Sequence, residues 1–430
     1  MKTLLRDCLA LSPADGITGP CDLRIDGDTI TERGRALSPA EGEEIVDIGG
    51  RCVIPGLVCA HTHLYSSLSR GMPPCARTPK NFRDRLRRIW WKLDSALDAD
   101  LIYWSALAGA LEGLRCGTTT ILDHHASPNA IEGSLSLIRE ALAEAGVRGV
   151  LCYEVTDRGG AKRRDAGLRE NERFIASCTG SATFRGLVGA HASFTLSDAS
   201  LERCAELARG TRTGVHIHVA EDMADVQDAR RRSHAGLMRR LERSGVASLR
   251  SVFAHCVHLG PEEFRALESS GAWAIHNPRS NMNNGVGHAP VGLFPGRSGL
   301  GTDGFPADMF EEARAGYFRA AEEGTGGRII GLVAGSWRLA GELFGRRFGS
   351  VAPGSVADLV VLDYRPPTPL HAANAAGHFL FGAGSAAVSS VMAGGTWVLW
   401  NRAFPRLDEE AIARRASRAA ARLWKRMEEA

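Results

Sequence analysis

The chain has 430 residues, of which 44% are hydrophobic and 23% are charged, and these proportions are those of a folded globular protein. They exclude disordered, collagen-like and membrane-embedded chains. The 52 basic residues exceed the 49 acidic residues by only three, which excludes a strongly basic protein that binds nucleic acid or an anionic membrane. We therefore expect a small-molecule substrate, with neither nucleic acid nor a membrane as the partner.

The cysteines and the N-terminal segment indicate a cytoplasmic protein. The ten cysteines are scattered singly along the chain without a C-x-x-C pair, as expected of reduced thiols. Arg6 and Asp7 interrupt the first apolar run, which therefore does not resemble a secretory signal. No stretch reaches the roughly 18 apolar residues that a membrane-spanning helix needs.

Both ends of the chain are predicted to form short strands. Residues 1–55 contain CDLRIDGDTITE, in which apolar and polar residues alternate around an Asp-Gly turn, and EEIVDIGGRCVIPG. Residues 356–430 contain similar strand-like runs, VADLVVLD and SSVMAGGTWVLW, and then end in a basic, alanine-rich helix from about residue 408. We expect the two ends to pair into one sheet domain, in which Asp358 and Asp363 serve turns.

Residues 56–355 alternate short apolar runs with helical patterns. The runs are VIPGLVCAH, GTTTILDHH, RGVLCYEV, RGLVGAH, GVHIHVAE, SVFAHC, WAIHN and SGLGTDG. Helical patterns such as IYWSALAGALEGLR separate many of them, which is typical of a parallel sheet covered by helices. Eight repeats of this kind predict an α/β fold with a (β/α)8 barrel. A doubly wound open sheet is the alternative.

Histidines and one aspartate follow these runs, at the points where the strands are expected to end: His61, His63, His124, His125, His191, His218, His255 and Asp303. In a barrel, this end of the strands forms the active-site face. His61 and His63 are two residues apart and point to the same side of their strand, where His218, His255 and Asp303 can join them. Imidazoles with one carboxylate suit zinc, with ferrous iron or manganese as alternatives.

His216 is an alternative to His218, because both residues face the same side of one strand. We prefer His218, which lies nearer to the strand exit and three residues before Glu221. The remaining histidines lack a comparable position, so we expect structural or surface roles for His234, His258, His276, His288, His371 and His378.

Further residues are candidates for contact with a substrate. His125, His191 and Asn281 lie just beyond predicted strands and face the same mouth of the barrel. Arg279 is a candidate contact for an anion or a carbonyl, and the alternative is a surface charge.

A tryptophan pair lies in the long segment after the first barrel strand. Trp90 and Trp91 are on a predicted helix that can cap the pocket and stack on a flat heterocycle. The alternative is a helix that packs its aromatic side on the barrel. Adjacent helical residues point about 100° apart, so only one of the two is expected to face a ligand.

Several motifs carry a resemblance to a known family. PGLVCAHTH, GTTTILDHH, GVHIHVAE, FAHCVHLGPEE, GLGTDG and VAPGSVADLVVLD resemble the amidohydrolase superfamily, in its branch of aminohydrolases and chlorohydrolases related to cytosine, guanine and adenosine-type deaminases. LDHHASPN, LCYEVTDR and NPRSNMNN are similar to the SsnA-type aminohydrolases. The resemblance implies a distorted barrel over residues 56–355, with a small β-sandwich built from residues 1–55 and 356–430, and a homodimer or larger assembly.

The resemblance also implies roles for individual residues. His61, His63, His218 and Asp303 match the metal ligands, Glu221 matches the proton shuttle, and His255 matches the residue that orients the attacking water. Asp303 would also take a proton from that water. We find no lysine at a strand end that could bridge two metal ions, so we expect one divalent metal ion, with zinc first.

The implied activity is hydrolytic deamination of an amino- or imino-substituted nitrogen heterocycle, such as a purine or a related cyclic amidine, with release of ammonia. The same chemistry could open a cyclic amide or an imidazolone, or displace chloride. A barrel subunit without catalysis is a more distant alternative.

Overall fold

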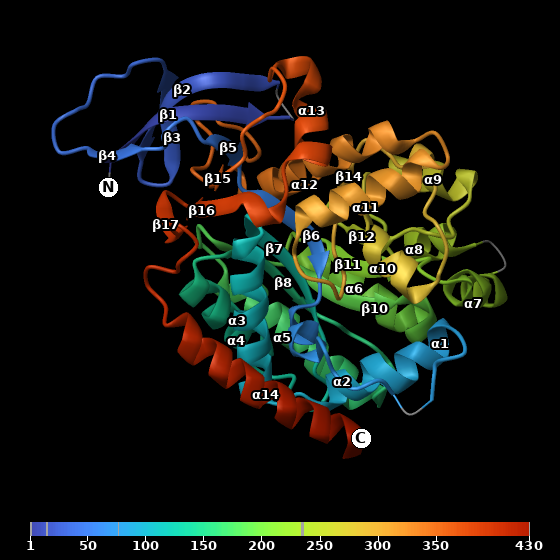
Figure 1. The fold of residues 1–430 in the computed structure, drawn as a ribbon. Helices are drawn as coiled ribbons and strands as arrows, with labels where there is room; N and C mark the ends of the chain where they lie inside the picture. Colours follow the sequence, from blue (N-terminus) through green and yellow to red (C-terminus); the bar gives the residue numbers. More distant parts are fainter. Residues whose placement is uncertain (1, 14–15, 76, 234–235, 430) are drawn as a thin grey trace.

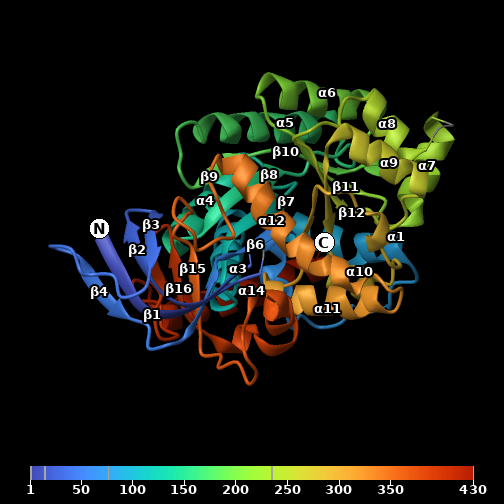
Figure 2. The same ribbon diagram turned by 90° about the horizontal axis from the view of Figure 1, so that it is seen from above.

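A ring of parallel strands lies at the centre of the molecule, and helices surround it (Figures 1 and 2). The structure is a computed structural model that describes residues 2–13, 16–75, 77–233 and 236–429. In chain order the ring contains β6 (Leu57–Thr62), β7 (Thr118–His125), β8 (Arg148–Tyr153), β9 (Phe184–Gly186), β10 (Val188–Ala192), β11 (Val215–Val219), β12 (Val252–His255), β13 (Trp273–His276) and β14 (Ser298–Leu300).

The ring consists of two parallel sheets, one of β6 to β9 and one of β10 to β14. Single backbone pairings join the two sheets at both seams, Thr62 with Asp303 and Val155 with Ala190. Since β9 and β10 are separated only by Leu187, they occupy one position, and the ring has eight positions among the described residues. The predicted barrel is therefore confirmed, and the open-sheet alternative is wrong.

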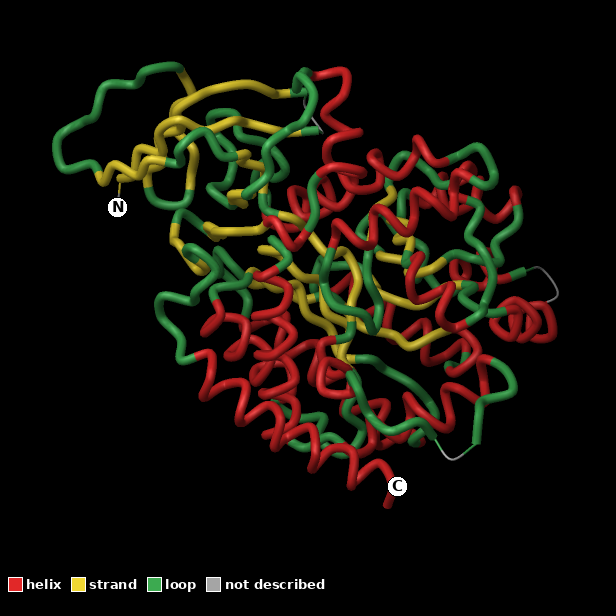
Figure 3. The backbone as a smooth tube through the Cα atoms, in the orientation of Figure 1, coloured by secondary structure: helices red, strands yellow, loops and turns green. Residues whose placement is uncertain are grey.

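Helices cover the outside of the ring (Figure 3). They are α3 (Ala99–Arg115), α4 (Ser134–Ala145), α5 (Gly160–Ser177), α6 (Asp198–Gly210), α7 (Met223–Ser233), α8 (Leu237–Arg243), α9 (Pro261–Ser270), α10 (Pro278–Asn284), α11 (Met309–Ala321) and α12 (Ile329–Phe344). Side chains of Asp98, Ser197 and Asp308 accept from backbone N–H groups at the starts of α3, α6 and α11. These caps satisfy donors that the first turn of a helix leaves unpaired.

Short segments complete the chain: η1 (Leu64–Ser69), α1 (Phe82–Arg85), the π-helical η2 (Leu86–Trp90), α2 (Trp91–Ala96), η3 (Ser193–Thr195), η4 (Val291–Leu293), η5 (Gly326–Arg328), η6 (Ala372–Asn374), α13 (Ala375–Gly377), the π-helical η7 (His378–Gly382) and η8 (Ser385–Ala387). The segment from α1 to α2 follows the first barrel strand, and it positions several pocket residues.

The two ends of the chain share a second sheet (Figure 1). It contains β1 (Lys2–Ser12), β2 (Ile17–Asp26), β3 (Thr29–Gly34), β4 (Glu44–Asp47), β5 (Cys52–Pro55), β15 (Leu359–Leu362), β16 (Val388–Ala393) and β17 (Thr396–Leu399). Strand β5 pairs with β1 on one side and with β15 on the other. The predicted pairing of the two ends is therefore present.

Asp358 has a different place from the predicted turn. It is buried, and its carboxylate accepts from Arg148 Nη1 at 2.6 Å and Thr119 Oγ1 at 3.0 Å, both in the barrel. It also accepts from the backbone N–H of Gly394 at 2.7 Å. Asp358 thus links the second sheet to the barrel, because a buried carboxylate needs several donors.

The last helix, α14 (Glu409–Glu429), lies along α2 and α3 (Figure 1). Trp424 Nε1 donates to the carbonyl of Leu68 at 2.8 Å, and Arg422 and Arg426 both pair with Asp98. This helix therefore stabilises the long segment after β6 from outside. None of the helices in the described residues has the length and apolar character needed to cross a membrane.

Candidate active site

Four side chains from three strand ends meet at one face of the barrel. His61, His63, His218 and Asp303 each offer a ligand atom, and these atoms all lie within 4.8 Å of one another. Asp303 Oδ1 lies 2.9 Å from His63 Nε2 and 3.4 Å from His61 Nε2, and the Nε2 atoms of His63 and His218 are 3.1 Å apart. All four residues are buried.

The donor set fits a divalent metal ion. His63 Nδ1 donates to the carbonyl of His124 at 2.6 Å, and His218 Nδ1 donates to the carbonyl of His191 at 2.7 Å. With Nδ1 protonated, each Nε2 presents a lone pair toward the cluster. His61 Nε2 is buried there without a hydrogen-bond partner. Three imidazole nitrogens and a carboxylate suit zinc, ferrous iron or manganese.

The backbone is unusual where the strands enter this site. His255 has φ 75°, Cys256 has φ 54° and Asp303 has φ 53°, although none of them is glycine. Such residues are uncommon in the left-handed region and gather at functional sites. The conformation lets Asp303 aim its carboxylate at His61 and His63 directly after β14.

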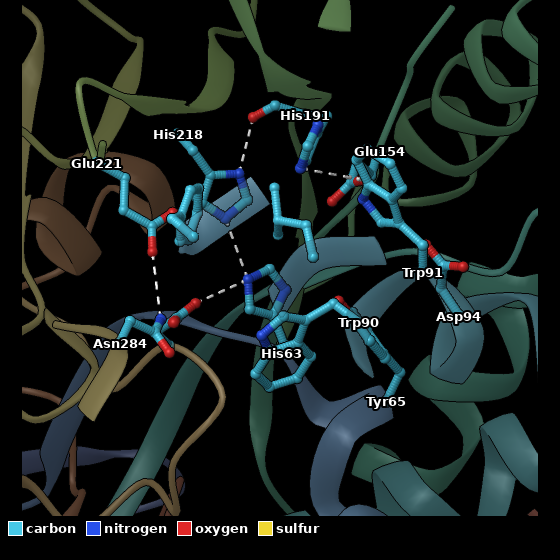
Figure 4. A pocket seen from close by; sticks show the side chains of 13 residues that line it. His63, Tyr65, Trp90, Trp91, Asp94, Glu154, His191, His218, Glu221 and Asn284 are labelled. Atoms are coloured by element: carbon cyan, nitrogen blue, oxygen red, sulfur yellow. Dashed lines mark hydrogen bonds and ion pairs between the residues drawn. The ribbon is translucent and has the colours of Figure 1, made fainter. Parts of the chain in front are cut away.

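Glu221 and His255 lie beside this cluster. Glu221 Oε2 is 3.7 Å from His255 Nε2, and Glu221 Oε1 accepts from Asn284 Nδ2 at 3.3 Å (Figure 4). Burial, together with the nearby Asp303 carboxylate, raises the pKa of Glu221 well above its usual value. Glu221 therefore favours the protonated form and can donate a proton. His255 Nδ1 is oriented by Asn281 Oδ1 at 2.8 Å.

A small cavity of about 40 Å³ lies in front of the cluster. It is lined by His63, Tyr65, Phe82, Leu86, Trp90, Trp91, Asp94, Glu154, His191, His218, Glu221, Asn284 and Asp303 (Figure 4). Two larger cavities, of about 420 and 390 Å³, lie beyond it, and Trp91 and Arg158 line both. The space at the cluster is thus narrow, and wider space lies beyond Trp91.

The segment 82–96 supplies one wall of the cavity. Phe82, Leu86, Trp90 and Asp94 recur every four residues and all line it, together with Trp91. Both tryptophans therefore line the cavity, and the expectation that only one of them faces a ligand stays a prediction. Trp90 is the last residue of the π-helical η2 and Trp91 is the first residue of α2, and Trp91 also lines the two larger cavities.

Glu154 is a pocket residue that was not selected from the sequence. Its carboxylate lies 3.5 Å from His124 Nδ1, 3.2 Å from Arg158 Nη2 and 4.0 Å from His191 Nε2. Burial alone would raise the pKa of Glu154, but these neighbours, His191 foremost, lower it far below its usual value. A charged carboxylate therefore faces the pocket opposite Glu221. Arg158 also bonds to Asp94 at 3.1 Å.

The candidate substrate residues divide into two groups. His191 and Trp90 line the cavity, whereas His125, Asn281 and Arg279 do not. His125 Nε2 bonds to Ser127 Oγ at 2.9 Å, and Asn281 supports His255. Arg279 is buried and pairs with Glu311 and Glu312, so it is neither a surface charge nor a wall of the pocket.

The other histidines lie apart from the cluster. His258 Nε2 bonds to the carbonyl of Val286 at 2.6 Å, His288 pairs with Glu323, and His378 bonds to Tyr364. His276 is buried at the end of β13, and His371 is exposed. His234 lies outside the described residues.

Comparison with known proteins gives a consistent result. Residues 52–398 match the amidohydrolase family. The chain is 30% identical over 411 residues to 5'-deoxyadenosine deaminase of Methanothermobacter thermautotrophicus, covering 93% of this chain and 94% of that protein. It is also 30% identical over 422 residues to 5-methylthioadenosine/S-adenosylhomocysteine deaminase of Desulforudis audaxviator, covering 92% and 95%.

Solved structures share the whole fold. An adenosine deaminase from Xanthomonas campestris with bound zinc matches with a TM-score of 0.85 at 21% identity, covering 98% of both chains. Atrazine chlorohydrolase from Arthrobacter aurescens, solved with zinc, matches with a TM-score of 0.82 at 20% identity, covering 97% of this chain and all of that one. At these identities, the two structures establish the fold alone.

Proposed function

This chain belongs to the amidohydrolase family, and we infer that it is a metal-dependent hydrolytic deaminase of an amino-substituted nitrogen heterocycle. The observation that carries the inference is the pairing of a four-residue metal cluster with the adjacent carboxyl group of Glu221, whose pKa is raised. We propose that the substrate is an adenosine derivative, because the related deaminases named above act on 5'-deoxyadenosine and 5-methylthioadenosine.

His61, His63, His218 and Asp303 would hold the metal ion. A divalent ion bound there lowers the pKa of water toward neutrality. We propose that Asp303 also takes a proton from the attacking water, while Ser280 Oγ donates to its Oδ2. His255, held by Asn281, orients this water toward the amino-bearing carbon.

Glu221 would act as the acid. As the water attacks, the Glu221 carboxyl protonates the adjacent ring nitrogen, so that negative charge does not accumulate on the ring. The carbon–nitrogen bond to the amino group then breaks, Asp303 returns its proton to the leaving amine, and ammonia departs. The proton that remains on the attacking oxygen passes to the Glu221 carboxylate, which regenerates the acid, and the heterocycle keeps this oxygen as an oxo group.

The far wall suits the rest of such a substrate. Asp94 and Glu154 are carboxylates, which accept hydrogen bonds from hydroxyl groups such as those of a sugar. Trp90 and His191 can contact the ring. The cavity at the cluster has about 40 Å³ of free space, and a substituent on the sugar can extend into the cavities beyond Trp91.

Zinc is our proposal for the native metal, on the basis of the nitrogen-rich ligand set. A role in purine metabolism follows from the proposed substrate. The homodimer, the cytoplasmic location and the domain boundaries at residues 55 and 355 stay predictions from the sequence.

The experiment that tests the function combines metal analysis with ammonia release. The purified chain is assayed with adenosine, 5'-deoxyadenosine, 5'-methylthioadenosine, aminopyrimidines, pterins and cyclic amidines, and metal is measured per chain. We expect one ion and ammonia from the adenosine derivatives. One ion with a new carboxylate or with chloride release would instead indicate ring opening or dechlorination, and no ion after reconstitution would indicate a non-catalytic barrel.

A further inference from the structure

A histidine beneath the metal cluster contacts one of its ligands. His216 is fully buried on β11, and its Nε2 lies 2.9 Å from His61 Nδ1. Its other ring nitrogen, Nδ1, lies 3.8 Å from Cys152 Sγ. The Cys152 thiol lies 3.6 Å from the carbonyl oxygen of Asp123. These contacts form a continuous chain from a backbone carbonyl on β7 to the metal cluster.

The donors and acceptors in this chain can be assigned from its far end. The carbonyl of Asp123 only accepts, so the Cys152 thiol donates to it and the sulfur accepts from His216 Nδ1–H. His216 Nε2 then carries a lone pair and accepts from His61 Nδ1–H. The reverse order would put a hydrogen on His61 Nε2, where a ligand needs its lone pair.

The other two histidine ligands are held differently. His63 and His218 donate through Nδ1 to backbone carbonyls, at 2.6 and 2.7 Å, and no side-chain substitution removes these acceptors. Within the described cluster, His61 is the histidine ligand whose orientation depends on another side chain. A substitution of that other side chain can therefore remove the hydrogen bond that orients His61.

We propose that His216 is a positioning residue of the metal centre, which accepts from His61 Nδ1–H and so holds the Nε2 lone pair of His61 toward the metal ion. Cys152 in turn fixes the orientation of the His216 ring. The proposal rests on the metal-dependent function inferred above, and it adds a side chain that touches neither metal nor substrate.

The test measures metal affinity rather than turnover alone. The dissociation constant for Zn²⁺ is determined by chelator competition for the wild type, His216→Phe and His216→Gln, and the visible spectrum of the Co²⁺ form reports ligand geometry. We expect His216→Phe to weaken binding by about 10- to 100-fold and to alter the spectrum, as loss of a ligand's supporting partner typically does. His216→Gln keeps an acceptor and should recover most of the affinity.

His276→Phe is the matched control, because His276 is equally buried at the end of another barrel strand and both its ring nitrogens lack hydrogen-bond partners in the described structure. It should leave both readouts unchanged. Should His216→Phe fail to fold, Cys152→Val removes the next link and should weaken binding several-fold, whereas Cys152→Ser should not.

Two results would overturn the proposal: wild-type affinity and spectrum in His216→Phe, or equal losses in the Phe and Gln variants, which would indicate packing alone. Failure of the proposed function is a separate result, namely a metal-loaded wild type that releases no ammonia from any compound in the panel.

Discussion

The four residues of the metal cluster are the site residues whose role is best defined. His63→Ala and Asp303→Ala each remove a ligand atom from a set in which all members lie within 4.8 Å. We expect both variants to lose bound metal and activity together, as measured by metal content and ammonia release. The His258 side chain bonds to the carbonyl of Val286 and not to the cluster. The His258→Ala variant should therefore keep its metal. A His258 variant without metal would contradict this ligand set.

Glu221 is expected to matter for turnover and not for metal binding. Glu221→Gln keeps the size of the side chain and its contact with Asn284, but it removes the transferable proton. We expect kcat to fall by roughly 10²- to 10⁴-fold, the usual contribution of a general acid. Metal content should equal that of the wild type, and near wild-type turnover would show that Glu221 is not the acid.

Asp94 makes stability depend on pH. Burial raises the pKa of Asp94 to about 7, despite Arg158. Between pH 4 and 7 the folded state therefore holds a proton that the unfolded state has lost, so stability falls as pH rises through this range, by up to about 4 kcal/mol. Asp94→Asn should flatten this fall, as measured by denaturant unfolding at pH 5 and pH 8. If the free energy of unfolding fell as much with pH in Asp94→Asn as in the wild type, the raised pKa of Asp94 would be contradicted.

Most of the site residues that could be predicted are polar residues at the ends of apolar runs, where the barrel strands were expected to end. His61 and His218 end apolar runs, and barrel topology alone brings such ends together. Glu154 also ends a run, RGVLCYEV, so the same pattern applied to carboxylates identifies it. The place of Arg279 was not predictable in this way, because its partner Glu312 lies on α11 and the contact depends on how α10 and α11 pack.

At the scale of elements, the segment 82–96 forms one wall of the site. Its tryptophans were recognised in the sequence, but the π turn that ends at Trp90 was not, because the helical pattern there does not reveal a local change in residues per turn. Trp90 also packs on the barrel, against Gly304 directly after Asp303. A Cβ at Gly304 would lie 2.6 Å from the Trp90 ring.

Two substitutions test this wall. Trp90→Ala should raise KM by roughly 10- to 100-fold, because stacking on a base contributes about 1–3 kcal/mol. Gly304→Ala should raise KM in the same direction by displacing the ring. Gly331→Ala, where a Cβ meets open space, is the control and should leave KM unchanged. Steady-state kinetics with the best compound of the panel provide the measurement, and an unchanged KM in Trp90→Ala would exclude stacking.

At the scale of the whole molecule, the metal site joins distant parts of the barrel. Its ligands come from the end of β6, from the turn after β14, which pairs with β6 at one seam between the two parallel sheets, and from β11 inside the second sheet. A metal ion bound only by the folded state stabilises it by about 2.7 kcal/mol at 100 times its dissociation constant. We expect a chelator to lower Tm by a few degrees in calorimetry. The His63→Ala variant should show no such shift.

The architecture was largely predictable because eight apolar runs with intervening helices permit few arrangements. The contacts between the two units were not, since Asp358 in VADLVVLD reads as a turn residue until Arg148 and Thr119 are placed beside it. Such contacts join residues more than 200 positions apart.

The position of β5 between β1 and β15 also has a consequence for the order in which the chain acquires its structure. About 300 residues separate β5 from β15, and at roughly 5–20 residues per second the ribosome needs about 15–60 s to make them. During this time β5 has an unpaired edge, which is a template for association with other chains. The β5 edge of an emerging chain therefore stays open to association with other chains until residue 362 has left the ribosome.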